Sequence, residues 1–239
     1  MNPENNLPEK IISELKSLSD KEKALFLPYF FKTGKGEYGE GDQFLGIQVP
    51  QQRKIAKKFL PAIDEKDLMI LITSPYHEVR LTALFMLVSK YEKSKTPLEK
   101  KQWVDFYLKN KQYVNNWDLV DSTAPKILGS WLYDKDRTLL YNLATSDDLW
   151  DQRIAIISTF FFIRKNDFDD TLKISEILLF HKHDLIHKAV GWMLREVGNR
   201  DYQTEYDFLK KHYKIMPRTM LRYALEKFEP EVKEMFMAK

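Results

Sequence analysis

Helical periodicity runs through almost the whole chain, and it constrains the fold more than any other feature of the sequence. Apolar residues recur every three or four positions in segments such as EVRLTALFMLVSKY (78–91), QRIAIISTFFFI (152–163) and LIHKAVGWMLREV (185–197). Alternating strand patterns between turn signals are missing. An acid or a proline marks several helix starts, at Asp20, Pro50 and Pro97. The sequence therefore predicts an all-α chain with about twelve to fourteen helices.

The composition is that of an ordinary globular protein. Charged residues make up 31% of the 239 residues and hydrophobic ones 44%, which is enough apolar surface for a core. The absence of cysteine excludes disulfides and thiolate metal sites. The first ten residues lack the apolar run of a signal peptide, and no apolar stretch is long enough to span a membrane. We expect one monomeric, cytoplasmic domain over residues 1–239.

A weak internal repeat is visible when helices are aligned on one column of charged residues. The column consists of Arg80, Asp121, Arg153, Lys188 and Arg222, with spacings of 41, 32, 35 and 34 residues. Periods of this length, with two helices each, are typical of an α-solenoid of HEAT-like repeats. Equivalent positions line its concave face, so four cations there predict a basic groove that follows a phosphate backbone. The alternative is that each cation is a solvated flank beside a buried stripe.

The stretch NNWDLVDSTAPKILG (115–129) holds the acid of that column. Trp117 and Asp121 are one turn apart and share a helix face. A carboxylate repels phosphate, but it stabilises the oxocarbenium-like transition state of glycosidic bond hydrolysis. Trp192 follows Lys188 by one turn, and tryptophan is the best aromatic partner for a cation. These residues favour a ligand with phosphates outside and a cationic base within; a core tryptophan beside a solvated acid remains the alternative.

A glycine-rich stretch and a pair of histidines are weak signals for a nucleotide site and a metal site. Five of the eight glycines fall between Gly34 and Gly46, and GKGEYG (34–39) satisfies a G-x-G-x-x-G pattern. Nucleotide-binding loops of that type follow a strand, which is not predicted here, so a surface loop is the better interpretation. His183 and His187 have a spacing that suits zinc, but no third ligand is adjacent. No metal or cofactor is expected.

Four segments resemble the AlkD-type DNA alkylation repair proteins, a family of HEAT-like-repeat DNA glycosylases. They are NNWDLVDSTAPKILG, DDLWDQRIAIIS, HKAVGWMLREV and FLGIQVPQQRKIAK, and the resemblance runs from about residue 20 to about residue 228. It implies a metal-independent enzyme that excises cationic N3- and N7-alkylpurines from double-stranded DNA during base excision repair.

The resemblance also implies roles for individual residues. Asp121 is expected to be the catalytic carboxylate, and Trp117 and Trp192 to contact the lesion nucleotide. The residues expected to bind DNA are Arg153, Lys188, Arg80, Arg195, Arg222, Tyr29 and Gln48. Non-catalytic members of the family leave a second function open, the binding of branched or distorted DNA. A protein-interaction solenoid is a third possibility, in which the basic column has no role.

Overall fold

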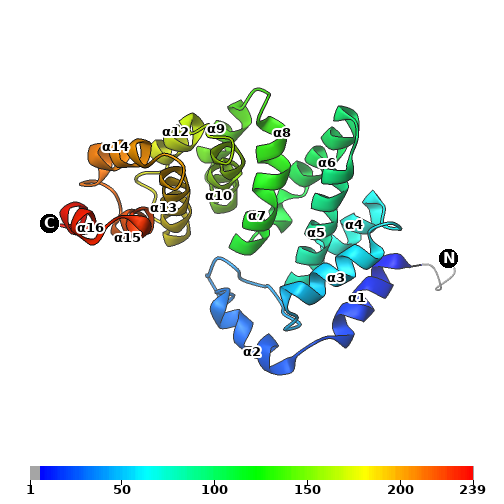
Figure 1. The fold of residues 1–239 in the computed structure, drawn as a ribbon. Coiled ribbons are helices and arrows are strands. Elements are labelled where there is room, and N and C mark those ends of the chain that lie inside the picture. Colours follow the sequence, from blue (N-terminus) through cyan, green and yellow to red (C-terminus); the bar gives the residue numbers. More distant parts are fainter. Residues whose placement is uncertain (1–5, 239) are drawn as a thin grey trace. The chain divides into compact units, whose positions relative to one another are not determined.

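The computed structural model describes residues 6–238, and its regular elements within that range are all helices (Figure 1). An isolated bridge between Gln43 and Tyr76 is the β-type pairing seen among these residues. Helices that follow one another along the chain pack together, as in a stack of helical repeats. The prediction of an all-α chain of helical repeats is confirmed. The chain forms two compact units, Met1–Thr123 and Ala124–Lys239.

Unit 1 packs around one long helix, α5 (His77–Lys93). Both faces of α5 are buried, because α3 and α4 lie against it together with α6. Its side chains Val79, Leu84 and Met86 are fully shielded from solvent. The other helices of the unit are α1 (Leu7–Ser17), α2 (Lys21–Phe30), α3 (Val49–Phe59), α4 (Glu65–Ile72), α6 (Pro97–Lys109), η2 (Lys111–Tyr113) and α7 (Trp117–Ala124).

The helix starts predicted from the sequence are confirmed by their caps. The Asp20 side chain accepts a hydrogen bond from the backbone N–H of Lys23 at 3.1 Å, which fixes the first turn of α2. Pro97 is the first residue of α6, where its missing N–H costs nothing. Thr96 and Glu99 complete that start as a reciprocal capping box. Local sequence therefore determines where these helices begin.

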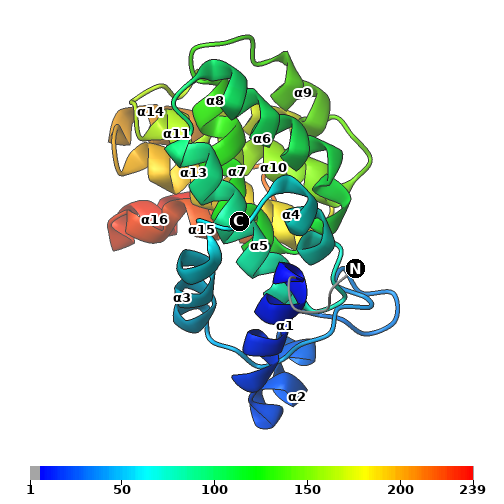
Figure 2. The same cartoon turned by 90° about the vertical axis from the view of Figure 1, so that its right-hand side faces the viewer.

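Helix α2 lies at the edge of unit 1 in both ribbon views (Figures 1 and 2). None of its residues is buried, although its sequence is rich in large apolar side chains. Leu25 is 74% exposed and Phe26 62% exposed, and Pro28 lies inside the helix, where its missing N–H removes one backbone hydrogen bond. Residues 31–48 then return the chain to α3, and we call this segment the glycine-rich loop.

Unit 2 packs around α13 (Asp184–Gly198), which lies against α10, α14 and α15. A Cβ at Gly191 would lie 2.4 Å from the carbonyl oxygen of Met220, so glycine allows α13 and α15 to approach closely. The remaining elements are η3 (Pro125–Gly129, a π-helical turn), α8 (Ser130–Leu132), α9 (Thr138–Ala144), α10 (Leu149–Ser158), α11 (Phe160–Ile163), α12 (Asp169–Ile177), α14 (Tyr202–His212), α15 (Arg218–Ala224), η4 (Leu225–Lys227) and α16 (Pro230–Met237).

Glu205 on α14 is a buried carboxyl group in unit 2. It is 2% exposed, and its Oε1 has no hydrogen-bond partner within residues 6–238. Burial raises the pKa of Glu205 to about 9, although the charge of Arg195 acts in the opposite direction. Glu205 is therefore protonated in the folded protein at neutral pH.

We expect Glu205→Gln to stabilise the protein increasingly as pH rises from 4.5 to 9. Above pH 4.5 the unfolded chain loses a proton that the folded chain retains, so this glutamate lowers stability as pH rises. Between pH 4.5 and pH 7.5 the gain should grow by up to about 4 kcal/mol in the free energy of unfolding, measured by urea denaturation. Glu234→Gln, at an exposed position of α16, is the control. An equal gain at pH 5 and pH 8 would contradict the assignment.

Candidate functional site

Helix α7 carries the predicted Trp117 and Asp121. The indole ring of Trp117 stacks on Phe31 with a centroid distance of 5.4 Å and meets Phe30 edge-on at 5.8 Å. Both Trp117 and Asp121 are half-buried. Pro125 has no N–H to give the carbonyl of Asp121, and the helix widens into a π-turn there. The aromatic ring is thus fixed by packing, one turn before the carboxylate.

A buried charge cluster lies next to Trp117. Asp118 accepts a hydrogen bond from Nε2 of His77 at 2.8 Å, and Asp42 from the glycine-rich loop lies 3.1 Å from Nδ1. Asp42 also pairs with Arg80 at 2.7 Å. The side chains of His77, Asp42 and Arg80 are each at most 5% exposed. We call these four residues the His77 cluster.

The two carboxylates hold His77 in its charged form. Burial lowers the pKa of an imidazole, but the charges and hydrogen bonds of Asp118 and Asp42 outweigh that effect and raise the pKa of His77 to about 9. Burial alone would raise the pKa of Asp42, yet hydrogen bonds and charges from His77 and Arg80 lower it. The cluster thus contains an imidazolium between two carboxylates, because each ion is paired.

Arg80 requires a correction to the sequence analysis. It was predicted to face a groove and bind DNA; at 4% exposed it corrects the expected exposure, while a DNA contact by Arg80 stays a prediction. Its guanidinium donates to the carbonyl of Ser74 at 3.0 Å and to Oδ1 of Asn115 at 3.2 Å, besides its ion pair with Asp42. These contacts pair both Nη atoms of the buried guanidinium, whereas Nε has no hydrogen-bond partner within residues 6–238. Arg80 therefore anchors the glycine-rich loop to α5 through Asp42.

The glycine-rich loop is also tied to α5 through Glu78. Its carboxylate accepts hydrogen bonds from the backbone N–H groups of Leu45, Gly46 and Ile47 at 2.8–3.3 Å. Gly46 has a φ of +80°, and a Cβ there would lie 2.2 Å from the carbonyl oxygen of Asp20. Only glycine fits this position. The end of the loop is a fixed part of the site.

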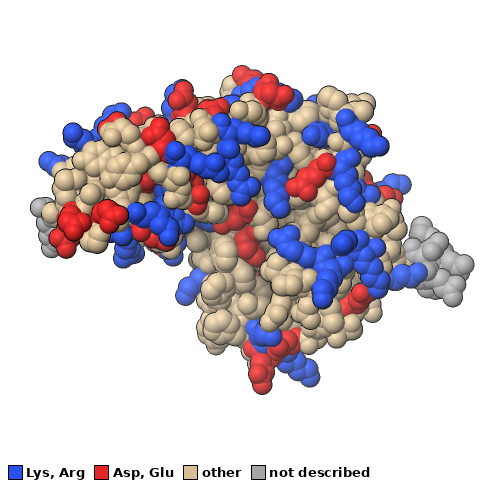
Figure 3. Space-filling view, viewed as in Figure 1, with Lys and Arg blue, Asp and Glu red and all other residues tan. Residues whose placement is uncertain are grey.

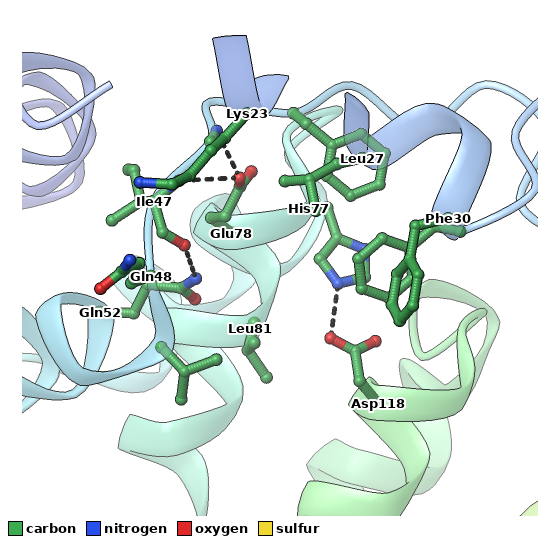
Figure 4. A pocket seen from close by; sticks show the side chains of 14 residues that line it. Lys23, Leu27, Phe30, Ile47, Gln48, Gln52, His77, Glu78, Leu81 and Asp118 are labelled. Carbon is green, nitrogen blue, oxygen red and sulfur yellow. Dashed lines mark hydrogen bonds and ion pairs between the residues drawn. The ribbon is translucent and has the colours of Figure 1, made fainter. Parts of the chain in front are cut away.

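A pocket of about 230 Å³ opens beside the His77 cluster. Figure 4 shows Asp118 and Phe30 on one side of it, Gln48 and Gln52 on the other, and Leu81 between them. Its wall comes from α2, the glycine-rich loop, α3, α5 and α7. The lining residues are Lys23, Leu27, Phe30, Phe31, Phe44, Gly46, Ile47, Gln48, Val49, Gln52, His77, Glu78, Leu81 and Asp118. Of the predicted site residues, Gln48 lines this pocket.

The predicted residues of unit 2 gather on α13. Lys188 and Trp192 are one turn apart and half-buried. Lys188 pairs with Asp184 at 2.6 Å, and the indole N–H of Trp192 donates to Glu196 at 2.9 Å. Arg195, on the same helix, pairs with Glu226. Lys188, Trp192 and Arg195 each contact a carboxylate of this protein. A DNA phosphate that binds Lys188 or Arg195 has to compete with that carboxylate.

Arg153 differs from the exposed phosphate contact that the sequence suggested. It is 4% exposed, and its Nη1 donates to the carbonyl of Leu185 at 2.7 Å, tying α10 to the start of α13. The expectation of an exposed column is corrected at this position as well, and a DNA contact by Arg153 stays a prediction. Arg222 on α15 is exposed.

Sequence reasoning missed a basic face on α3. Its four cations, Arg53, Lys54, Lys57 and Lys58, are all exposed, and basic side chains gather over α3 in Figure 3. Lys58 pairs with Glu14 at 2.6 Å. The signal in the sequence is the local pattern RKxxKK, with cations at i, i+1, i+4 and i+5 on one helix; it lies within one helix and is not part of the column between repeats.

Two further residues that the sequence predicts to bind DNA, Gln48 and Tyr29, are accessible in unit 1. Gln48 is the exposed N-cap residue of α3, and Tyr29 on α2 is 78% exposed. Exposed tyrosine and glutamine side chains are able to contact nucleic acid. Within unit 1, the structure thus offers Tyr29, Gln48 and the basic face of α3 as accessible candidates for a DNA contact.

Comparison with known proteins gives the family. The model of the DNA alkylation repair enzyme family matches residues 11–228. The chain belongs to this family. A solved structure described as a predicted DNA alkylation repair enzyme from Enterococcus faecalis is similar to the chain, with a TM-score of 0.68. The two are 18% identical, over 89% of this chain and 97% of the other, so the likeness shows the fold alone. No curated protein matches.

Membership in the DNA alkylation repair family supports a role in alkylation repair, with DNA as the partner. Within residues 6–238, no group of three or more His, Asp or Glu side chains is arranged to hold a metal ion. Among the same residues, no helix is both long and apolar enough to cross a membrane.

Proposed function

We propose that this DNA alkylation repair protein is a glycosylase that hydrolyses the N-glycosidic bond of cationic N3- or N7-alkylpurines in duplex DNA. The observation that carries the proposal is the face of α7 with Trp117 and Asp121. The indole is fixed by stacking on Phe31, and the carboxylate is half-buried one turn away. Family membership supports the assignment to alkylation repair.

The proposed chemistry needs one carboxylate. An alkylated purine already carries a positive charge, so the bonding electron pair leaves with the base and neutralises it without prior protonation. Positive charge then develops on the sugar, where Asp121 stabilises it. A water molecule attacks the anomeric carbon, and Asp121 orients this water and accepts its proton. The indole face of Trp117 stabilises a neighbouring cation, worth ~0.5–2 kcal/mol per contact.

DNA binding is proposed to use exposed cations. The basic face of α3 is one such surface, and Gln48 at the N-cap of α3 and the exposed Tyr29 on α2 are proposed as further contacts. The resemblance to the AlkD-type proteins supports further proposed contacts. Trp192 is proposed to contact the lesion nucleotide, and the DNA contacts proposed on the same ground are those of Lys188, Arg195, Arg222, Arg153 and Arg80. The second candidate function, non-catalytic binding of distorted DNA, is favoured by the same basic face, since it requires no carboxylate.

We expect the wild type to release 7-methylguanine from duplex DNA and to act on uracil at least ~100-fold more slowly. Uracil is neutral and needs a general acid, whose contribution is typically 10²- to 10⁴-fold. The measurement is single-turnover base release from two duplexes that differ only in the lesion. The control is DNA affinity against salt, where log K should fall with a slope of about −0.9 per phosphate neutralised.

Three outcomes separate the candidate functions. Release of 7-methylguanine alone supports the glycosylase. If neither base is released but DNA affinity falls steeply with salt, the non-catalytic DNA-binding function is supported instead. An affinity that does not respond to salt leaves a protein-interaction solenoid as the remaining interpretation.

A further inference from the structure

The solvent-facing side of α13 pairs its cations with carboxylates of the protein itself. This side carries Asp184, Lys188, Trp192 and Arg195, whose spacing of three or four residues keeps them on one side of the helix. Lys188 pairs with Asp184 at 2.6 Å, and Arg195 pairs with Glu226. Two closed ion pairs therefore stand where the sequence predicts cations that bind phosphate.

The second pair joins two parts of unit 2 that are distant in the sequence. Glu226 belongs to η4, which continues directly from the end of α15, and it lies 31 residues after Arg195. Helix α13 packs between α10 and α15, and α12 and α14 lie above it in Figure 1. Arg222 on α15 is exposed in the same row of helices. The ion pairs thus belong to a row that also offers an unburied cation.

Both ion pairs lie at the protein surface and are easily opened. The carboxylate side chains are half exposed, at 55% for Asp184 and 51% for Glu226. Exposed ion pairs contribute little to stability, because water and salt screen them. Hydrogen bonds from arginine to phosphate are stronger, since they are often bidentate, and DNA also gains from counterion release. A DNA phosphate can therefore take the place of either carboxylate.

Arg195 needs an anion when Glu226 leaves. Its side chain is only 18% exposed, so its charge is less well hydrated than that of a surface arginine. The buried Glu205 on α14 does not replace Glu226 as a partner, because its carboxyl group is protonated at neutral pH. A phosphate that displaces Glu226 restores the pairing of the guanidinium.

We propose that Asp184 and Glu226 act as intramolecular competitors of DNA, which occupy Lys188 and Arg195 until backbone phosphates displace them. The inference rests on the proposed DNA contacts of these two cations and goes beyond them, because it gives two acidic residues an inhibitory role. Phosphate contacts supply affinity for any DNA sequence. The two carboxylates therefore lower the affinity for undamaged DNA and shorten the time that the protein spends on it.

The test is a double-variant cycle on Arg195 and Glu226. Its readout is the affinity of the full chain for an undamaged, fluorescein-labelled duplex at fixed salt. Glu226→Gln should bind about 2- to 5-fold more tightly than wild type, which corresponds to the strength of one exposed ion pair. Arg195→Gln should bind about tenfold more weakly, because a charge-assisted phosphate bond is lost. In the Arg195→Gln background, Glu226→Gln should change the affinity by less than about 1.5-fold, since no occupied cation is left to release.

A matched control separates this role from the general effect of removing a charge. Glu176 on α12 pairs with Lys211 at 2.8 Å, and its side chain is 42% exposed. Glu176→Gln opens a similar ion pair away from α13, so DNA affinity should stay within about 1.5-fold of wild type. The same cycle with Asp184→Asn and Lys188→Gln is an independent measurement, and it decides if Arg195→Gln fails to fold.

Each outcome bears on the inference. A gain in affinity from Glu226→Gln that disappears in the Arg195→Gln background supports it. An equal gain in both backgrounds shows general repulsion of phosphate and overturns it. The absence of a gain overturns it as well, and so does an Arg195→Gln variant that binds DNA as tightly as wild type.

None of these titrations involves base release, so the glycosylase proposal is judged separately. Release of 7-methylguanine without a gain in affinity from Glu226→Gln refutes the competitor role alone. A gain without base release supports the competitor role and leaves the non-catalytic DNA-binding function. A protein that does not bind duplex DNA refutes both.

Discussion

Replacing Asp121 by Asn should lower single-turnover release of 7-methylguanine by about 10²- to 10³-fold, the scale seen when one preorganised electrostatic group is removed. The substitution keeps the size of the side chain and removes its charge. The sugar then develops positive charge beside a neutral amide, and the attacking water loses its proton acceptor. The amide also retains the helix position, one turn after Trp117, so the loss is confined to charge.

DNA affinity separates this role from DNA binding. A carboxylate repels phosphate, so Asp121→Asn should bind duplex DNA as tightly as wild type or slightly more tightly at fixed salt. Asp105→Asn is the matched control, because Asp105 lies in the same unit and its side chain is 57% exposed. It should leave the excision rate unchanged. If Asp121→Asn releases 7-methylguanine at the wild-type rate, the catalytic carboxylate lies elsewhere.

Replacing His77 by Leu should destabilise the protein by about 3–5 kcal/mol, the cost of leaving buried charges without their partner. Asp118 loses its only hydrogen-bond donor found within residues 6–238, and Asp42 keeps Arg80 alone. Since Asp42 belongs to the glycine-rich loop, the loop loses one of its attachments to α5. The free energy of unfolding is measured by urea denaturation at pH 6.5.

The stability that His77 contributes should decrease as pH rises. The pKa of His77 is raised from 6.5 to about 9 by its carboxylate partners, so its stabilisation is fully present below pH 6.5 and is lost as pH rises through 9. The total loss is up to roughly 3 kcal/mol. The measurement is the difference in the free energy of unfolding between wild type and His77→Leu at each pH. Glu205 in unit 2 also makes stability depend on pH, but it is present in both proteins, so its contribution cancels in this difference. A difference that stays constant from pH 6.5 to 9.5 would show that His77 is not charged in the fold.

A double variant tests whether the pairing itself matters. His77→Leu with Asp118→Leu removes both partners and places apolar groups in their space. It should be more stable than His77→Leu alone, because no unpaired carboxylate then remains at position 118. If the two changes are additive, His77 and Asp118 do not stabilise each other.

The sequence alone determined the local features of this protein. Apolar residues at three- and four-residue spacing predicted the helices, and Asp20 and Pro97 predicted where two of them begin. The shared helix face of Trp117 and Asp121 followed from their spacing within α7. Each of these features depends on residues at most one turn apart, so they can be derived from backbone geometry without knowledge of the fold.

Tertiary structure decided which charged side chains are buried and which distant residues they pair with. Arg80 and Arg153 occupy the same sequence positions as the other cations of the predicted column. A carboxylate 38 residues away nevertheless pairs with the first, and a carbonyl 32 residues away accepts from the second. His77 likewise contacts partners 35 and 41 residues away. An arginine or histidine is stable in the interior only where such partners converge. Helical periodicity contains no information about that convergence, because it arises when distant helices and the glycine-rich loop pack against α5.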